Sequence, residues 1–164
     1  PTSGEVYVAE QRLTNMSENQ VAKWRGRNVG VVFQFFQLLP TLTVLENVMM
    51  PMNYCNTYKG KRTERALEML ELVDVVDVAN KYPSMISGGQ QQRAAIARAL
   101  VNDPKIIVGD EPTGNLDTVS AGLIFALFEE LVESGKTIVM VTHDKDLASY
   151  IPRVEEVQDG QLVA

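Results

Sequence analysis

The segment from residue 86 to residue 117 constrains the fold of this chain more than any other part of it. It contains Ser87-Gly88-Gly89-Gln90, followed by a stretch rich in Ala, Ile and Leu. A serine and glycines ahead of such a stretch are typical of a helix start, where free backbone N–H groups and the positive dipole end favour a phosphate. An apolar run at 105–109 then leads to two adjacent carboxylates, Asp110 and Glu111. The segment therefore predicts a helix, then a buried strand that ends in acidic side chains.

The hydrophobic pattern along the chain predicts an α/β protein. Apolar runs at 105–109 and 137–142 lack strict alternation, which is typical of strands buried in a parallel sheet. Helical stretches separate the strands, and such an order gives a parallel sheet with helices packed on it. The expected strands are 5–9, 29–34, 105–109, 137–142 and 154–161, the last with a turn at Asp159-Gly160. The expected helices are 18–27, one that begins after Thr43, 62–73, 87–101, 118–133 and 144–150.

The order of these elements predicts one domain with two lobes. The 164 residues suffice for one domain. The core lobe consists of the strand-rich ends, at about 1–41 and 104–164, and a helical subdomain at about 42–103 is inserted between them.

Asp110 and Glu111 lie where open α/β sheets bind ligands, beyond the carboxyl end of a strand. One carboxylate there can hold a hydrated Mg²⁺, and the other can polarise a water molecule. Adjacent strand residues point to opposite faces, so both roles require the strand to end at this pair. An isolated Asp-Glu pair is more often a solvated strand end, but the following sequence Pro112-Thr-Gly-Asn-Leu-Asp117 favours the functional interpretation.

With these motifs the chain resembles the ATP-binding cassette (ABC) ATPases. Ser87-Gly88-Gly89-Gln90 is similar to their signature motif, and residues 106–111 are similar to their Walker B strand. The resemblance implies a parallel-sheet, P-loop NTPase-like core with a helical subdomain, and ATP and Mg²⁺ as cofactors. It implies that the signature motif binds the γ-phosphate of ATP held by the opposite cassette of a dimer. It also implies that Asp110 orients the Mg²⁺ shell and that Glu111 is the general base.

Three further residues receive roles from the same resemblance. Gln34 closes the expected strand 29–34 and resembles the Q-loop glutamine, which contacts Mg²⁺ and water. His143, the only histidine, resembles the switch histidine that reaches the γ-phosphate. Asp117 resembles the D-loop aspartate, which acts across the dimer interface. Taken alone, a glutamine at a strand end is more often a surface residue, and a lone histidine is more often structural.

The P-loop pattern G-x-x-x-x-G-K-[ST] occurs nowhere in the sequence. Gly135-Lys136-Thr137 matches only its end and precedes a strand, so we interpret this glycine as a helix C-cap. In the family the P-loop lies N-terminal to the stretch that begins this chain. We therefore expect the C-terminal part of a longer cassette, short by roughly 30 residues or more. Residues 1–164 alone are expected to be inactive, and the alternative is a remnant that acts only as a binding module.

Composition limits the partners and the compartment. The net charge of −6 disfavours a nucleic-acid partner, which usually meets a basic face. The single cysteine, Cys55, fits a reducing compartment, and no apolar run approaches the length of a membrane span. We expect a cytoplasmic protein that lies on the inner face of the cell membrane and binds transmembrane permease subunits.

The run from residue 37 to residue 48 and the run 112–117 resemble one branch of the family. This branch contains the ATPases of lipoprotein-release, macrolide-efflux and antimicrobial-peptide-resistance exporters, and it implies export or membrane extraction of a substrate. ABC proteins of DNA repair or translation are disfavoured because residues 38–86 are too few for a coiled-coil insert. The segment after Gln34 is expected to contact the permease through its apolar side chains, Phe35, Phe36, Leu38 and Leu39, and a Met-rich stretch at 49–52.

Overall fold

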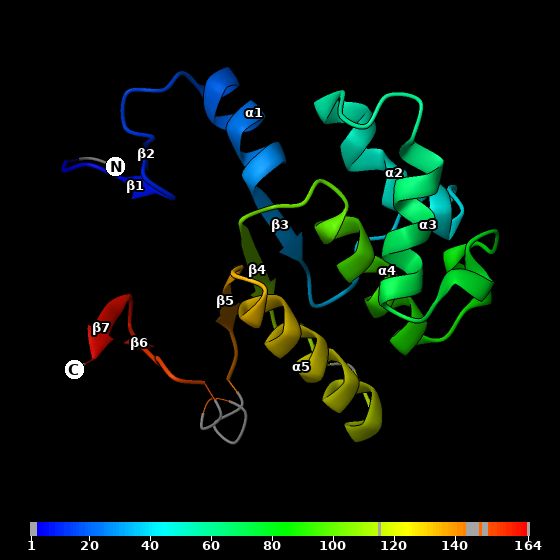
Figure 1. Ribbon diagram of the computed structural model, residues 1–164. Coiled ribbons are helices and arrows are strands. Elements are labelled where there is room, and N and C mark those ends of the chain that lie inside the picture. Colours follow the sequence, from blue (N-terminus) through cyan, green and yellow to red (C-terminus); the bar gives the residue numbers. More distant parts are fainter. Residues whose placement is uncertain (1–2, 115, 144–147, 149–150, 164) are drawn as a thin grey trace.

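The computed structural model describes residues 3–114, 116–143, 148 and 151–163. Figure 1 shows a parallel sheet near the centre of the molecule, with a group of helices to its right and a single long helix that runs from beside the sheet toward the lower right. The helices are α1 (Glu18–Asn28), α2 (Val44–Cys55), α3 (Arg62–Leu72), α4 (Gly88–Leu100) and α5 (Thr118–Glu133), with short 3₁₀ turns at Val76–Val78 and Pro83–Met85. The strands are β1 (Tyr7–Val8), β2 (Gln11–Arg12), β3 (Val29–Val32), β4 (Ile106–Asp110), β5 (Thr137–Val141), β6 (Glu156–Gln158) and β7 (Gln161–Val163).

The parallel sheet has the order β3-β4-β5 and confirms the expected α/β fold. Gly30 of β3 pairs with Ile107 of β4, which in turn pairs with Ile138 of β5. All three strands therefore end at the same edge of the sheet, where the residues that follow them are brought together.

Local capping signals position the helices. Ser17, Thr43 and Ser87 each cap a helix, and in each case the side chain of the third helical residue, Gln20, Glu46 or Gln90, accepts from the backbone N–H of the cap. Such a box satisfies two N–H groups that a helix start otherwise leaves without a partner. The expected helices 18–27, 62–73, 87–101 and 118–133 are confirmed to within one or two residues at their ends.

The hydrophobic core joins the sheet to the helices. α2, α3 and α4 pack against one another, and α4 also packs against β3. Gly30 permits this last contact, because a Cβ at this position would lie 2.5 Å from the backbone oxygen of Ala99. The largest fully buried apolar side chains of this core are Met52, Leu70, Ile96, Ile107 and Ile124. The boundary between the two expected lobes stays a prediction.

The expected burial of the strands is wrong for one face of the sheet. Burial alternates along β4, and no residue of β5 is fully buried. Val139 is 50% exposed and Val141 is 58% exposed. The reason is that the helices of the described chain pack on the side of Ile107 and Ile138, so that the opposite side of β5 faces solvent.

The ends of the chain differ from the expectation. Of the expected strand 5–9, only the two residues of β1 form a strand, and β1 pairs with β2 in a hairpin. The expected strand 154–161 is divided between β6 and β7 of a second hairpin. The expected turn at Asp159 and Gly160 is confirmed, and both residues have positive φ. The expected helix 144–150 lies almost entirely outside the described residues. None of the described helices combines the length and the hydropathy that crossing a membrane requires.

Candidate functional site

The carboxyl edge of β4 holds two of the predicted site residues. β4 ends at Asp110, which is exposed. Glu111 has a φ of 45°, in the left-handed region, and its N–H donates to the carbonyl of Val141 at 2.9 Å. The extended strand therefore stops between the two carboxylates, which confirms the expectation that the strand ends at this pair. A non-glycine residue with positive φ costs free energy and is often found at a functional site.

Glu111 is held by the residues that follow β5. Its Oε1 accepts from the backbone N–H of His143 at 2.8 Å and lies 2.5 Å from the Nδ1 of the same residue. Its Oε2 accepts from the Thr142 hydroxyl at 3.4 Å. The Glu111 side chain is only 14% exposed, whereas that of His143 is 85% exposed. The carboxylate is thus oriented from the neighbouring strand, and the imidazole beside it is open to solvent.

Gln34 approaches the same carboxylate. A Cβ on Gly114 would lie 3.5 Å from the Oε2 of Glu111 and 3.6 Å from the Nε2 of Gln34. The two side chains therefore border one small space, which glycine at this position leaves open. Strand register explains the approach, because Val32 of β3 pairs with Gly109 of β4 and the chain continues from each to the shared edge.

The oxygen donors at this edge fit Mg²⁺. Asp110 supplies a carboxylate and Gln34 an amide oxygen, which are the hard ligands that Mg²⁺ prefers. Among the described residues, no three His, Cys, Asp or Glu side chains form a group that could hold a metal ion. Mg²⁺ bound with a nucleotide needs fewer protein ligands, because it usually keeps several waters and takes one or two carboxylates together with phosphate oxygens.

The predicted signature residues form the start of α4. The hydroxyl of Ser87 accepts from the N–H of Gln90 at 3.2 Å, and the N–H of Ser87 donates to the Gln90 side chain at 3.0 Å. Gly88 and Gly89 lie in the first turn. A Cβ on Gly88 would lie 3.7 Å from the ring of Phe36, so the start of α4 adjoins the loop after Gln34.

The start of α4 also adjoins the start of α5, where Asp117 is the N-cap. A Cβ on Gly89 would lie 3.1 Å from the hydroxyl of Ser120. That hydroxyl donates to Oδ2 of Asp117 at 2.7 Å, and the N–H groups of Ser120 and Val119 donate to Oδ1. The hydrogen bond from the Ser120 N–H is the main cause that lowers the pKa of Asp117, so the carboxylate is ionised at neutral pH. The two motifs that are expected to act across the dimer interface are thus neighbours in this chain.

Three buried polar residues near the site were not among the predicted ones. Arg98 of α4 donates to the carbonyls of Phe36 and Gln37. Asn47 of α2 exchanges hydrogen bonds with the backbone of Leu39. Gln92 of α4 donates to the carbonyl of Pro112, while its Oε1 is buried with no hydrogen-bond partner among the residues that the structure describes. The detectable signal was a polar side chain within an otherwise apolar helical stretch, which is strongest for Arg98.

The partial P-loop match has the structural role that we predicted. Gly135 has a φ of 91° and lies directly after α5. Its N–H and that of Lys136 donate back to the last turn of the helix. The Lys136 ammonium contacts Asp103 Oδ1 at 2.6 Å and the carbonyl of Pro104 at 3.0 Å. This lysine therefore ties the start of β5 to the segment before β4.

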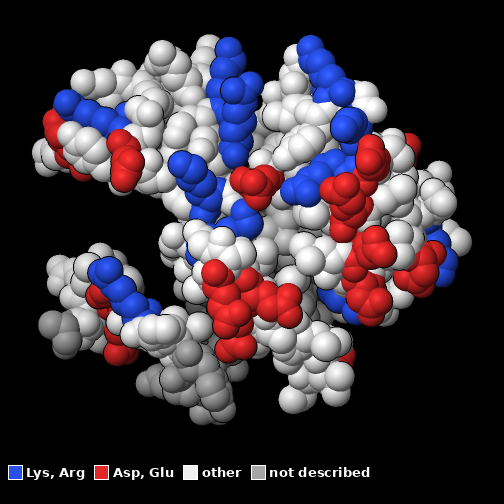
Figure 2. Space-filling model, in the orientation of Figure 1, with Lys and Arg blue, Asp and Glu red and all other residues white. Residues whose placement is uncertain are grey.

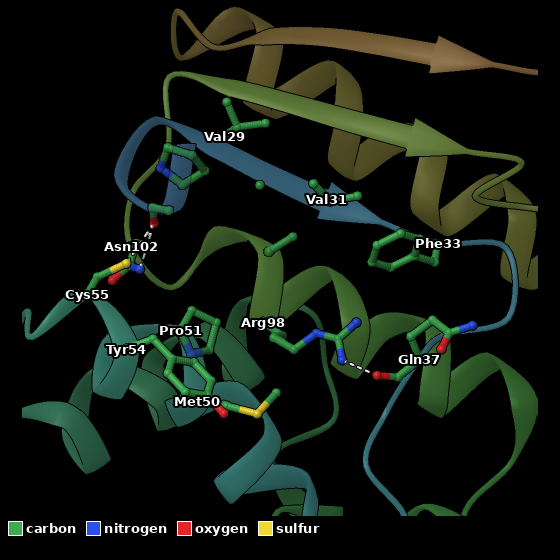
Figure 3. Close-up of a pocket in the computed structure, with 14 residues that line it drawn as sticks. Val29, Val31, Phe33, Gln37, Met50, Pro51, Tyr54, Cys55, Arg98 and Asn102 are labelled. Carbon is green, nitrogen blue, oxygen red and sulfur yellow. Dashed lines mark hydrogen bonds between the residues drawn. The ribbon is translucent and has the colours of Figure 1, made fainter. Parts of the chain in front are cut away.

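A groove lies between β3 and the helices α2 and α4 (Figure 3). Its volume is about 350 Å³, and its lining is mostly apolar, with Arg98 and Gln37 at one end. The lining residues are Gly26, Val29, Gly30, Val31, Phe33, Gln37, Met50, Pro51, Tyr54, Cys55, Arg98, Ala99, Asn102 and Pro104.

The expected apolar contact segment is only partly available. Phe35 is 67% exposed and Leu39 is 42% exposed, but Leu38 packs against the core and Met52 is fully buried. The expectation is therefore wrong for Leu38 and Met52, because Leu38 packs on the core where its neighbour Leu39 is exposed, and Met52 lies with Val48 on the buried side of α2. In the view of Figure 2, basic side chains gather along α1 and acidic side chains over the end of α5.

Sequence comparisons identify relatives of the chain. The family model described as "ABC transporter" matches residues 1–114. The ABC transporter ATP-binding proteins MJ1508 of Methanocaldococcus jannaschii and YvrO of Bacillus subtilis are both 48% identical to the chain over 163 residues. The lipoprotein-releasing system ATP-binding protein LolD of Xanthomonas campestris is 47% identical over the same length. The matches cover 99% of this chain and 73%, 71% and 68% of these three relatives.

The fold matches solved structures of the cassette MJ0796. One is a dimer in a post-hydrolysis state bound to ADP and Pi, with a TM-score of 0.87 and 42% identity. A second dimeric structure of the same cassette has a TM-score of 0.87 and 43% identity. Each match covers 99% of this chain and 72% of the solved chain.

Proposed function

The chain belongs to the ABC transporter family as part of an ATP-binding cassette, and we propose that the complete cassette hydrolyses ATP to power a membrane exporter. ATP hydrolysis would drive the export of a substrate, or its extraction from the membrane, through separate permease subunits. The similarity to LolD, at 47% identity, supports the lipoprotein-release and macrolide-efflux branch. A cytoplasmic position on the inner face of the membrane follows from this proposal.

The carboxylate of Glu111 is the observation that carries the proposal. It is mostly buried and oriented by His143 and Thr142, and it points to the edge where a ligand of a parallel sheet binds. A fixed carboxylate beside an open imidazole suits a general base that orients the attacking water. His143 would donate to the γ-phosphate.

Gln34 and Asp110 would hold Mg²⁺ together with the nucleotide. The ion, when bound, neutralises charge that develops on the transferred phosphate. The structure of MJ0796 with ADP and Pi supports nucleotide binding by a cassette of this fold. The residues of this chain would contribute oxygen ligands and a positioned base, and little covalent chemistry is required of them.

Two cassettes would combine to form the complete site. Ser87, Gly88, Gly89 and Gln90 would bind the γ-phosphate held by the opposite cassette, with Asp117 beside them. The contact between Gly89 and Ser120 supports a joint role, because both motifs then belong to one surface. The dimeric structures of MJ0796 support this assembly.

Residues 1–164 alone are expected not to hydrolyse ATP, because the sequence lacks the P-loop lysine and the N–H groups that position the triphosphate. The measurement is phosphate release from Mg-ATP by a purified chain of verified mass, with the complete cassette, read from the upstream coding sequence, as the control. Turnover by the chain at the rate of the complete cassette would contradict the assignment. If neither protein hydrolyses ATP, the alternative of a non-hydrolysing binding module is favoured.

The groove and the exposed side chains beside it are the proposed permease contact. A polar substitution such as Leu39→Ser is expected to reduce transport while ATP hydrolysis by the free cassette stays nearly unchanged, since Leu39 is exposed and contributes little packing. Stability should change by no more than about 0.5 kcal/mol, as for other surface substitutions. The measurements are substrate transport in vesicles and the melting temperature. Leu162→Ser, at a 70% exposed position in β7, is the matched control. A Leu39→Ser protein that loses ATP binding would show that this residue belongs to the core.

A further inference from the structure

Arg98 is a buried cation whose partners are backbone carbonyls. It lies near the end of α4 and is only 8% exposed. One guanidinium nitrogen donates to the carbonyl of Gln37 at 2.5 Å and the other to that of Phe36 at 2.7 Å (Figure 3). No ion pair to Arg98 is present among the described residues, and burial lowers its pKa. Burying a charge is unfavourable unless other interactions replace its hydration, and here the two carbonyls provide only part of that compensation.

The loop that receives these hydrogen bonds has an unusual backbone. Phe36 has a φ of 56° and Gln37 a φ of 50°, and neither is a glycine. Residues of this kind persist in the left-handed region only where the surrounding structure imposes it. Gln34 lies two residues before this pair, so the carbonyls that Arg98 holds are in the segment that fixes the position of Gln34.

The chemistry of arginine explains why the residue is not lysine. A guanidinium is planar and presents several donors in a fixed fork, so one side chain can hold two successive carbonyls in one geometry. An ammonium is a compact point charge on a flexible stem and does not impose that geometry. Asn47 holds the far end of the same loop, because its side-chain oxygen accepts from the N–H of Leu39 at 2.7 Å.

Arg98 also lies between two other features of the molecule. It lines the groove together with Phe33 and Gln37. It belongs to the same helix as Gly88, which begins that helix beside the ring of Phe36. A change in the groove that moves the guanidinium would therefore move the loop after Gln34.

We propose that Arg98 is a positioning residue that holds the loop after Gln34 and thereby sets Gln34 for catalysis. The effect on catalysis rests on the function proposed above, whereas the anchoring of the loop does not. Arg98 touches neither nucleotide nor reacting atoms in this proposal and acts through the backbone of Phe36 and Gln37.

The test compares Arg98→Lys and Arg98→Met with Arg65→Lys in the complete cassette. Arg65 is the matched control, because its guanidinium also donates to a backbone carbonyl, that of Val101 at 3.2 Å, but lies away from the loop. The methionine variant keeps the apolar stem and removes a buried charge that is costly to desolvate, which partly offsets the loss of the two hydrogen bonds. It therefore keeps the test valid if the lysine variant folds poorly.

The first measurement is amide hydrogen exchange in a peptide spanning residues 33–39. We expect exchange to be about tenfold faster in both Arg98 variants and unchanged in Arg65→Lys, since hydrogen bonds from a charged donor are among the stronger ones. Exchange at the wild-type rate in both Arg98 variants would overturn the anchoring role, whether or not the protein hydrolyses ATP.

The second measurement is the kinetics of ATP hydrolysis. We expect kcat to fall by about tenfold in the Arg98 variants, as for a lost positioning interaction, while KM for ATP stays near the wild-type value. A fall in kcat of equal size in Arg65→Lys would show a general structural effect and overturn the positioning of Gln34 by Arg98. If the wild-type cassette hydrolyses no ATP but the loop still exchanges faster in the Arg98 variants, the anchoring role is retained and the proposed function is rejected.

Discussion

Replacing Glu111 by glutamine in the complete cassette is expected to lower ATP hydrolysis by about 100-fold or more, because a general base contributes on this order. Glutamine has the same shape but cannot accept the proton from water. Its amide oxygen can still accept from the N–H of His143, so the local structure should persist. ATP binding should therefore remain, and two cassettes should stay associated around the nucleotide that neither can hydrolyse.

The measurements for this variant are phosphate release, nucleotide binding and size-exclusion chromatography with Mg-ATP. Glu129→Gln is the matched control, since it makes the same change at an exposed position of α5. We expect the control to hydrolyse ATP like the wild type. A Glu111→Gln protein that is monomeric with Mg-ATP, or that still turns over at the wild-type rate, would contradict the assignment of this carboxylate.

Gly30→Ala is expected to destabilise the chain by about 3 kcal/mol, near the upper end of what overpacking usually costs. The added Cβ would lie 2.5 Å from the backbone oxygen of Ala99 and 3.2 Å from the ring of Pro104. Backbone atoms of a buried helix cannot rotate away as a flexible side chain can, so β3 or α4 must shift. The same shift would displace the loop after Gln34.

The control for this prediction is the identical chemical change at Gly122. This glycine is exposed on α5, and a Cβ there would meet no atom of the described residues within 4 Å. Gly122→Ala should stabilise the chain by about 0.5–1 kcal/mol, because alanine loses less backbone freedom in a helix. Equilibrium urea unfolding of both variants measures the two effects, which are expected to have opposite signs. Equal small effects would show that β3 and α4 are not in firm contact.

Much of the fold was predictable because its signals are local. Ser17, Thr43 and Ser87 indicate helix starts because their hydroxyl groups can cap a helix. The apolar spacing between residues 118 and 133 indicates α5 without tertiary information. The position of Asp110 and Glu111 at the ligand-binding edge of the sheet was also predictable, because both residues follow a strand-like run and parallel strands end at the same edge.

Other features depend on residues far apart in the sequence and were therefore not predictable. Arg98 and Gln37 are 61 residues apart, and only the folded chain shows that one holds the backbone of the other. An apolar run such as 137–141 indicates a strand but not how many of its faces are covered. Leu38 and Leu39 look alike in sequence, yet one packs on the core and the other is exposed.

The pairing of β3 with β4 has a consequence for the order of folding. The segment 33–105 separates these two strands, whereas only α5 and short turns separate β4 from β5. Closing a long loop costs more conformational entropy than closing a short one, and contacts between distant residues form slowly. We therefore expect the β4-α5-β5 unit to form first, and β3 to join it only after α2, α3 and α4 have collapsed together. During synthesis, β3 would remain an unpaired apolar strand until most of the chain has been made. This delay makes β3 the segment most prone to pair incorrectly with other chains.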